Sequence, residues 1–182
     1  MMIAGLDWSM SSPAICIYDN TKPLSFDNCQ FFFLTTKPSL NKEFGNVHGF
    51  LMKEWDTEEE RFDFISEWGI KILTRFGVKE ACLEGYAMGA KGKVFNIAEN
   101  IGLLKHKMWK AGIKFIVPAP TQVKKHFTTK GNANKELMYN SLTEREPNVK
   151  LADLLKCKVD GSPVSDIVDS YAMTSFYMTN RE

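Results

Sequence analysis

The sequence lacks a long apolar run and a recognisable targeting segment. No stretch of it approaches the roughly 18 apolar residues that a membrane-spanning helix needs. Its first residues, Met1 to Asp7, contain none of the basic residues that open a signal peptide. We therefore expect a cytoplasmic protein with no membrane partner.

Paired cysteines are also missing. The four cysteines, Cys16, Cys29, Cys82 and Cys157, are widely spaced and form no CxxC motif. Three of them lie in apolar runs that are typical of strands, which favours reduced thiols in the core over zinc ligands or disulfides. We expect no structural metal site.

The chain has almost no net charge, at +1, so its overall charge does not indicate a polyanion-binding protein. The charges are nevertheless segregated along the sequence. Residues 91–135 contain ten lysines and one acid, Glu99, whereas residues 54–67 contain seven acids and one base, Arg61. This pattern predicts one face for a polyanion and another for water.

The hydrophobic pattern of the 182 residues fits one domain over residues 1–182. Strands are predicted at 3–7, 14–18 and 29–34, separated by turn residues, and would form an antiparallel meander. Residues 35–56 contain Pro, Gly and Asn without a clear period and are predicted to be a long loop or insertion.

Strands and helices alternate in the rest of the chain. Helical spacing begins after Thr57, a predicted N-cap, and ends at Gly77. Later strands are expected at 78–84 and 113–117, and helices at 94–111, 120–127, from Asn132 to 143, and 162–179. The prediction is an α/β fold with a mixed five-stranded sheet, an antiparallel meander plus a parallel half, flanked by helices.

Four carboxylates have positions that could bring them together. Asp7 and Glu84 each follow an apolar strand, so parallel central strands would place both at one sheet edge. Asp166 and Asp169 are three residues apart and would share one face of the last helix near its N-terminus. The alternative is that all four are solvated acids at strand ends and in a first helical turn.

A cluster of four carboxylates would repel itself unless cations lay between the side chains. Oxygen ligands suit Mg²⁺ or Mn²⁺, and two such ions about 4 Å apart can hold a phosphodiester, activate water and stabilise the leaving oxygen. This chemistry needs neither a histidine or cysteine nucleophile nor a nucleotide cofactor.

Four segments, in this order, resemble the RuvC family of Holliday junction resolvases. They are Ile3-Ala4-Gly5-Leu6-Asp7, the segment from Leu83 to Lys91, the segment from Val117 to Lys125, and Asp166-Ile167-Val168-Asp169-Ser170-Tyr171-Ala172. The resemblance implies a ribonuclease H-like fold and a homodimer that nicks four-way DNA junctions with Mg²⁺, in a bacterial or phage-infected cell.

The resemblance makes Asp7, Glu84, Asp166 and Asp169 the catalytic metal ligands. It places Lys124 and Lys125 at the DNA backbone and Lys91 and Lys93 in a loop near the junction. Together with the lysine-rich stretch, it gives eight predicted DNA contacts: Tyr86, Lys91, Lys93, Lys105, Lys107, Lys124, Lys125 and Lys130.

The sequence departs from the family in places. Trp8-Ser9 replaces a Pro-Gly, Ala87 takes the place of an aromatic wedge that Tyr86 could supply, and residues 35–56 form a longer segment than usual. Trp8 and Trp109 are further candidates for stacking on bases, with core or dimer interface as the alternative for Trp109. Other open hypotheses are a nuclease for flaps, Y-branches or RNA, a catalytically silent DNA-binding dimer, and an actin-like ATPase, which would need a second domain.

Overall fold

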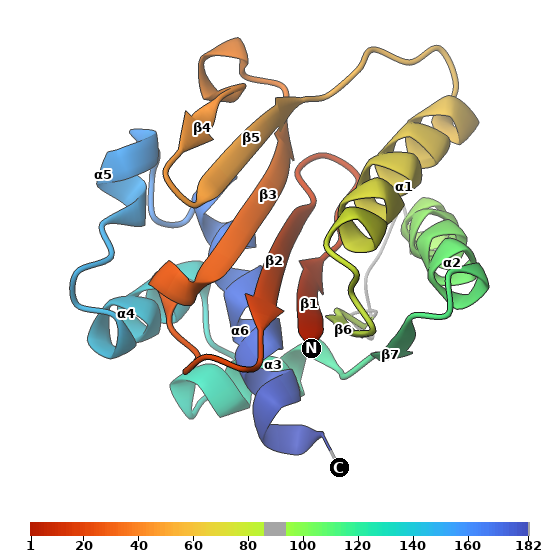
Figure 1. Cartoon of the computed structure of the whole chain (residues 1–182). Helices are drawn as coiled ribbons and strands as arrows, with labels where there is room; N and C mark the ends of the chain where they lie inside the picture. The colour runs from red at the N-terminus through yellow and green to blue at the C-terminus, as the bar shows by residue number, and fades with distance from the viewer. Residues whose placement is uncertain (86–93, 182) are drawn as a thin grey trace.

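A computed structural model of the chain describes residues 1–85 and 94–181 (Figure 1). Seven strands in this described part form one sheet with the order β4-β5-β3-β2-β1-β6-β7. Their bounds are β1 Met2–Asp7, β2 Ala14–Asp19, β3 Cys29–Thr35, β4 Glu43–Phe44, β5 Val47–Leu51, β6 Glu80–Leu83 and β7 Lys114–Ile116. The strands β1, β2 and β3 are antiparallel neighbours, whereas β1, β6 and β7 are parallel, so the predicted mixed sheet is confirmed.

The prediction of five strands was too low because β4 and β5 lie within residues 35–56. The strand β5 pairs in parallel with β3, and β4 pairs with β5 in antiparallel orientation. Only Val47 and Gly49 of β5 are buried, so the strand carries little apolar signal of its own. Its hydrogen bonds to β3 stabilise it instead, and local sequence does not report such pairing.

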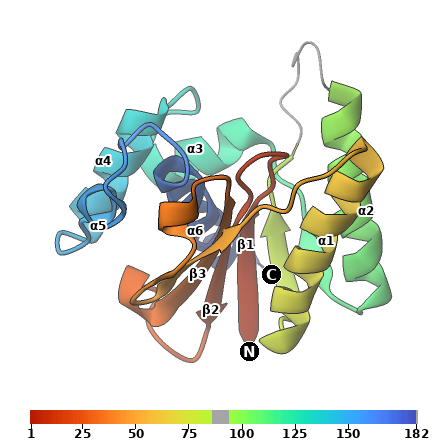
Figure 2. The same ribbon diagram turned by 90° about the horizontal axis from the view of Figure 1, so that it is seen from above.

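Helices cover both faces of the sheet (Figure 2). Helices α1 and α2 lie on one face, and α3 to α6 lie on the other. The helices are α1 Glu58–Arg75, α2 Val94–Lys110, α3 Pro120–Thr128, α4 Lys135–Arg145, α5 Leu151–Leu155 and α6 Val164–Asn180, with 3-10 turns at Phe26–Asn28 and Pro38–Leu40. None of the described helices is long and apolar enough to cross a membrane.

Helix starts follow from side-chain caps. The Thr57 hydroxyl accepts a hydrogen bond from the backbone N–H of Glu60 at 3.2 Å, as its predicted N-cap role requires. Helix α4 begins later than predicted because Asn134, and not Asn132, is its cap, accepting from the Leu137 N–H at 2.9 Å. The five-residue helix α5 was not predicted, since it is too short to show a helical period.

The sheet separates two apolar cores. Phe31 and Phe33 of β3 belong to the core under α6, while Phe32 belongs to the core under α1 and α2. This strand is therefore buried on both faces, one of the two predicted explanations for its aromatic run. Cys16, Cys29 and Cys82 are buried in strands as free thiols, as expected.

Helix α6 lies directly against β1 at Gly5. A β-carbon on Gly5 would overlap the carbonyl oxygen of Ser170 and the hydroxyl of Thr174, and it would lie 2.7 Å from the backbone nitrogen of Thr174. Two of these atoms are backbone, so they cannot rotate away. Glycine at this position therefore sets the distance between the helix and the central strand.

We expect Gly5→Ala to lower the free energy of unfolding by about 1–3 kcal/mol, the usual cost of overpacking a close contact. The matched control is Gly102→Ala in α2, where a β-carbon meets nothing within 4 Å and alanine should stabilise the helix by about 0.5–1 kcal/mol. Urea unfolding followed by circular dichroism measures both. Equal stability of Gly5→Ala and the wild type would contradict the proposed contact.

Candidate active site

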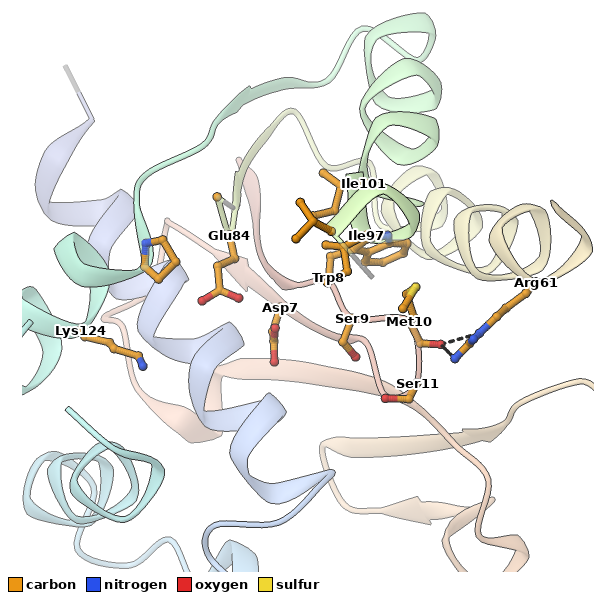
Figure 3. A pocket seen from close by; sticks show the side chains of 13 residues that line it. Asp7, Trp8, Ser9, Met10, Ser11, Arg61, Glu84, Ile97, Ile101 and Lys124 are labelled. Carbon is orange, nitrogen blue, oxygen red and sulfur yellow. Dashed lines mark hydrogen bonds between the residues drawn. The ribbon is translucent and has the colours of Figure 1, made fainter. Parts of the chain in front are cut away.

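Asp7 and Glu84 lie next to each other at one edge of the sheet. Leu6 pairs with Leu83 in the parallel β1–β6 register, and the Glu84 N–H continues the ladder by donating to the Leu6 carbonyl at 3.2 Å. Side chains alternate along strands, so Asp7 lies on the same face as Gly5, the face that α6 covers. Figure 3 shows the two carboxylates beside each other.

Helix α6 brings two more carboxylates to this edge. Its contact with Gly5 involves Ser170 and Thr174, so the turn that precedes Ser170 lies toward the carboxyl end of β1. Asp166 is in the first turn of α6 and is buried, and Asp169 follows one turn later. The predicted convergence of all four acids is supported by the influence of Asp169, Glu84 and Asp166 on Asp7.

Burial and mutual repulsion raise the pKa values of these acids. The pKa of Asp7 is well above its usual range, first because the group is desolvated and then because Asp169, Glu84 and Asp166 are negatively charged. Burial likewise raises the pKa of Glu84. Burial, followed by the charges of Glu84 and Asp166, raises the pKa of Asp169 to about 7.

Two lysines offset part of this negative charge. Lys124 of α3 lowers the pKa of Glu84 and Asp169, and Lys135 lowers the pKa of Asp7 and Asp169. The Lys135 ammonium donates to the Ser165 hydroxyl at 3.1 Å, and that hydroxyl lies 3.3 Å from Asp166 Oδ1. Lys135 was not among the predicted site residues. Its one sequence signal is a cation in the first turn of α4, where the helix dipole disfavours it.

A cleft of about 630 Å³ opens beside Asp7 and Glu84 (Figure 3). One wall is the loop after β1, whose Met10 carbonyl accepts hydrogen bonds from Arg61 Nε at 2.9 Å and Nη2 at 2.6 Å. The Arg61 guanidinium also stacks on the Trp55 ring, 4.4 Å from its centroid. Helix α1 thereby holds the loop that borders the site.

The predicted DNA-contacting residues are scattered around this cleft. Lys124 lines it, whereas Lys125 and Lys130 are exposed on or just after α3, and Lys105 is half-buried on α2. Three predicted contacts, Tyr86, Lys91 and Lys93, lie outside the described residues, as does Ala87.

Lys107 is placed differently from the prediction. Its ammonium contacts Asp63 at 3.0 Å and Glu67 at 2.6 Å, and its side chain is only 16% exposed. These ion pairs join α2 to the acidic helix α1, so the basic and acidic stretches of the sequence partly neutralise each other in space. The predicted separation into two faces is wrong at this point, because the two helices are packed neighbours (Figure 1).

Trp8 does not stack on a ligand, as it is only 4% exposed. Its indole packs on α1, where a β-carbon on Gly69 would overlap it, and stacks with Trp68 at a centroid distance of 6.2 Å. Trp109 is 71% exposed, which excludes the core alternative for this side chain.

Comparisons with known proteins point to one fold. No family model and no curated sequence matches the chain. Thermus thermophilus RuvC matches with a TM-score of 0.62 and 16% identity, over 98% of this chain and 96% of that one. The same RuvC in complex with a Holliday junction substrate matches with a TM-score of 0.63 and 16% identity, over 98% of this chain and 93% of that one. Fowlpox virus resolvase, in a complex with substrate Holliday junction DNA, matches with a TM-score of 0.54 and 17% identity over 100% of both chains.

The chain has a RuvC-like resolvase fold. This confirms the predicted ribonuclease H-like class and extends it over nearly the whole sequence. The two strands added to the expected five leave the central β1–β6 pair as the place where the carboxylates meet.

The carboxylates of this RuvC-like fold suit a hard cation. Asp166 Oδ2 is buried without a hydrogen-bond partner, and a buried carboxylate oxygen of this kind is costly unless a proton or cation meets it. The pKa values of Asp7, Glu84 and Asp169 are raised in the absence of such a charge. In the observed conformations, no three His, Cys, Asp or Glu side chains in residues 1–85 and 94–181 form a ready metal cage. Small side-chain rotations would therefore have to accompany ion binding.

The raised pKa of Asp169 predicts how stability depends on pH in EDTA. The native state keeps a proton up to about pH 7, whereas the unfolded state loses it near the ordinary value of 3.8, so stability should fall as pH rises through this window. Asp169→Asn should weaken this dependence. It should also raise the melting temperature at pH 8, by about 2–4 °C for each kcal/mol of repulsion removed.

Thermal unfolding at pH 5 and pH 8 measures this effect. The control is Asp153→Asn, which removes an exposed carboxylate from α5 and should leave the pH dependence unchanged. A wild-type melting temperature that is the same at both pH values would contradict the electrostatic account.

Proposed function

We propose that this protein is a metal-dependent endonuclease that cleaves phosphodiester bonds in branched DNA, with four-way junctions as its main substrate. The observation that carries the proposal is the meeting of Asp7, Glu84, Asp166 and Asp169 at one edge of a RuvC-like sheet. The solved relatives in complex with Holliday junctions support the choice of substrate, since their folds match over nearly the full chain.

The four carboxylates would hold two Mg²⁺ or Mn²⁺ ions. When bound, such ions activate water and stabilise the leaving oxygen of a phosphodiester. Lys124 faces the same cleft and would pair with a phosphate oxygen of the bound strand. Lys135 acts at one remove, because its hydrogen bond to Ser165 restrains the side chain next to Asp166.

Other lysines are assigned by their exposure. Lys125 and Lys130 are exposed close to Lys124 in the sequence and would contact the DNA backbone outside the cleft. Lys105 remains a proposed contact on α2, while Lys107 is removed from the set because Asp63 and Glu67 already neutralise it. Tyr86, Lys91 and Lys93 stay proposed contacts on the strength of the sequence.

A homodimer through α2 completes the proposal. Phe95 and Trp109 are 81% and 71% exposed, the largest exposures among the large apolar side chains of the described chain. They are two heptads apart in α2, with Gly102 midway, so all three share the helix face opposite the buried Leu104. A second copy of the chain would cover this stripe and place a second active site on the same junction.

Asp7→Asn should abolish cleavage in Mg²⁺ and leave junction binding intact or tighter, since one negative charge is removed near the DNA. Gel assays of cleavage and fluorescence anisotropy of binding, with wild type in Mg²⁺ and in EDTA as references, measure the two effects. A control is Asp153→Asn, which should cut like the wild type because this exposed acid lies on α5.

The substrates for this assay are four-way, three-way, flap and RNA duplexes. Faster cutting of flaps or RNA than of four-way junctions would replace the proposed substrate with one of those. Cleavage by Asp7→Asn at the wild-type rate would overturn the active site, and binding without cutting by the wild type would favour a silent DNA-binding dimer.

Trp109→Glu should convert the dimer into a monomer, because it buries a charge in the proposed apolar interface. Light scattering coupled to size-exclusion chromatography gives the mass directly. The matched control, Leu154→Glu, alters an apolar side chain that is 46% exposed on α5 and should remain dimeric. A wild-type protein that elutes as a monomer with and without DNA would contradict the proposed assembly.

A further inference from the structure

The cleft at the active site has an apolar half. Asp7, Glu84 and Lys124 account for the part where ions and a phosphate would lie. The remaining lining comes from the loop after β1 and from the first turns of α2, and its apolar members are Trp8, Met10, Val94, Ile97 and Ile101. Figure 3 shows Ile97, Ile101 and Trp8 on the side of the carboxylates away from Lys124. This half is continuous with the site of chemistry.

The size and chemistry of the cleft suit more than a sugar-phosphate backbone. Its volume of about 630 Å³ is within the range of pockets that enclose small organic groups. Val94 and Ile97 are only partly buried and present carbon to the cleft, which a charged backbone would not cover favourably. The part of a nucleotide that has apolar faces is its base.

Polar groups border the apolar wall on one side only. The Ser9 hydroxyl accepts a hydrogen bond from the Ser12 N–H at 2.9 Å, which leaves its own proton available to donate. Ser11 is exposed on the same loop and lines the cleft as well. Hydroxyls at the rim of an apolar slot match a flat ring with apolar faces and a hydrogen-bonding edge.

We propose that the base next to the scissile phosphate leaves its stack and enters the apolar half of the cleft, between Met10 and the α2 wall at Ile97. This inference rests on the proposed nuclease function. One nucleotide would then occupy the whole cleft, with its phosphate near Asp7 and Glu84. The base would be read at a position where no duplex could fit.

The loop that forms the rim is held in place before any ligand binds. Arg61 fixes the Met10 carbonyl through two hydrogen bonds, and Trp8 anchors the start of the loop under α1. A preformed slot lowers the cost of capturing a base. Unstacking a base costs a few kcal/mol and least where pairing is already weak, so the slot would favour cutting at branch points over intact duplex.

The experiment uses 2-aminopurine, a fluorescent adenine analogue that brightens when it unstacks, at each nucleotide flanking the mapped cut site of a four-way junction. The protein is Asp7→Asn in Mg²⁺, so binding is observed without cleavage. We expect fluorescence to rise at one flanking position on binding. Ile97→Phe in the same background should fill the slot and weaken capture about tenfold, the usual effect of changing an apolar pocket by a few carbons.

The matched control is Ile116→Phe, which enlarges an isoleucine that is 37% exposed on β7, outside the cleft lining, and should keep the full rise. Ile97→Ala removes the wall instead of filling the slot, so it also should weaken the rise and covers any folding defect of the phenylalanine variant. An equal rise in both Ile97 variants, or no rise at any position while the junction is bound, would overturn the base slot and leave the nuclease intact. Failure of the wild type to cut any branched DNA would instead overturn the proposed function and the slot with it.

Discussion

The carboxylate edge depends on the close approach of α6 to β1 at Gly5. Because no side chain separates the helix from the strand, the first turns of α6 lie beside the end of β1, and Asp166 and Asp169 come within electrostatic reach of Asp7. Any side chain at Gly5 would move the helix and with it half of the site. A single absent β-carbon thus connects the packing of the core to the spacing of the acids.

The site stores repulsion that the fold has to offset. Asp7 and Asp166 are buried, and burial raises the pKa values of Asp7, Glu84 and Asp169. Within the described residues, Lys124 and Lys135 supply the counter-charge that lowers these values. Such an arrangement costs stability without ions and becomes favourable with them, which is the expected character of a site built for hard cations.

Much of the fold could be predicted because its central elements carry strong local signals. The runs around Asp7 and Glu84 read as strands, Thr57 as a cap and Gly77 as a helix end, and the structure confirms each. The strand β5 could not be predicted, since its stability comes from pairing with β3.

Contacts between distant segments explain what the sequence did not reveal about the site. The burial of Trp8 depends on Gly69, which lies about sixty residues further along the chain. Lys107 was expected to face DNA but meets acids of α1, and Lys135 was missed because only the folded chain brings α4 beside α6. Charge along a sequence therefore indicates a surface only after packing is known.

The anchoring of the loop after β1 has a genetic consequence. Trp8 follows Asp7 directly and rests on Gly69, in the middle of a helix that contributes no carboxylate to the site. A larger residue at that glycine would displace the indole and shift the backbone next to the first acid. Inactivating alleles should therefore arise in α1 as well as at the acids themselves, and a survey of loss-of-function changes would trace the outline of the support beneath the cleft.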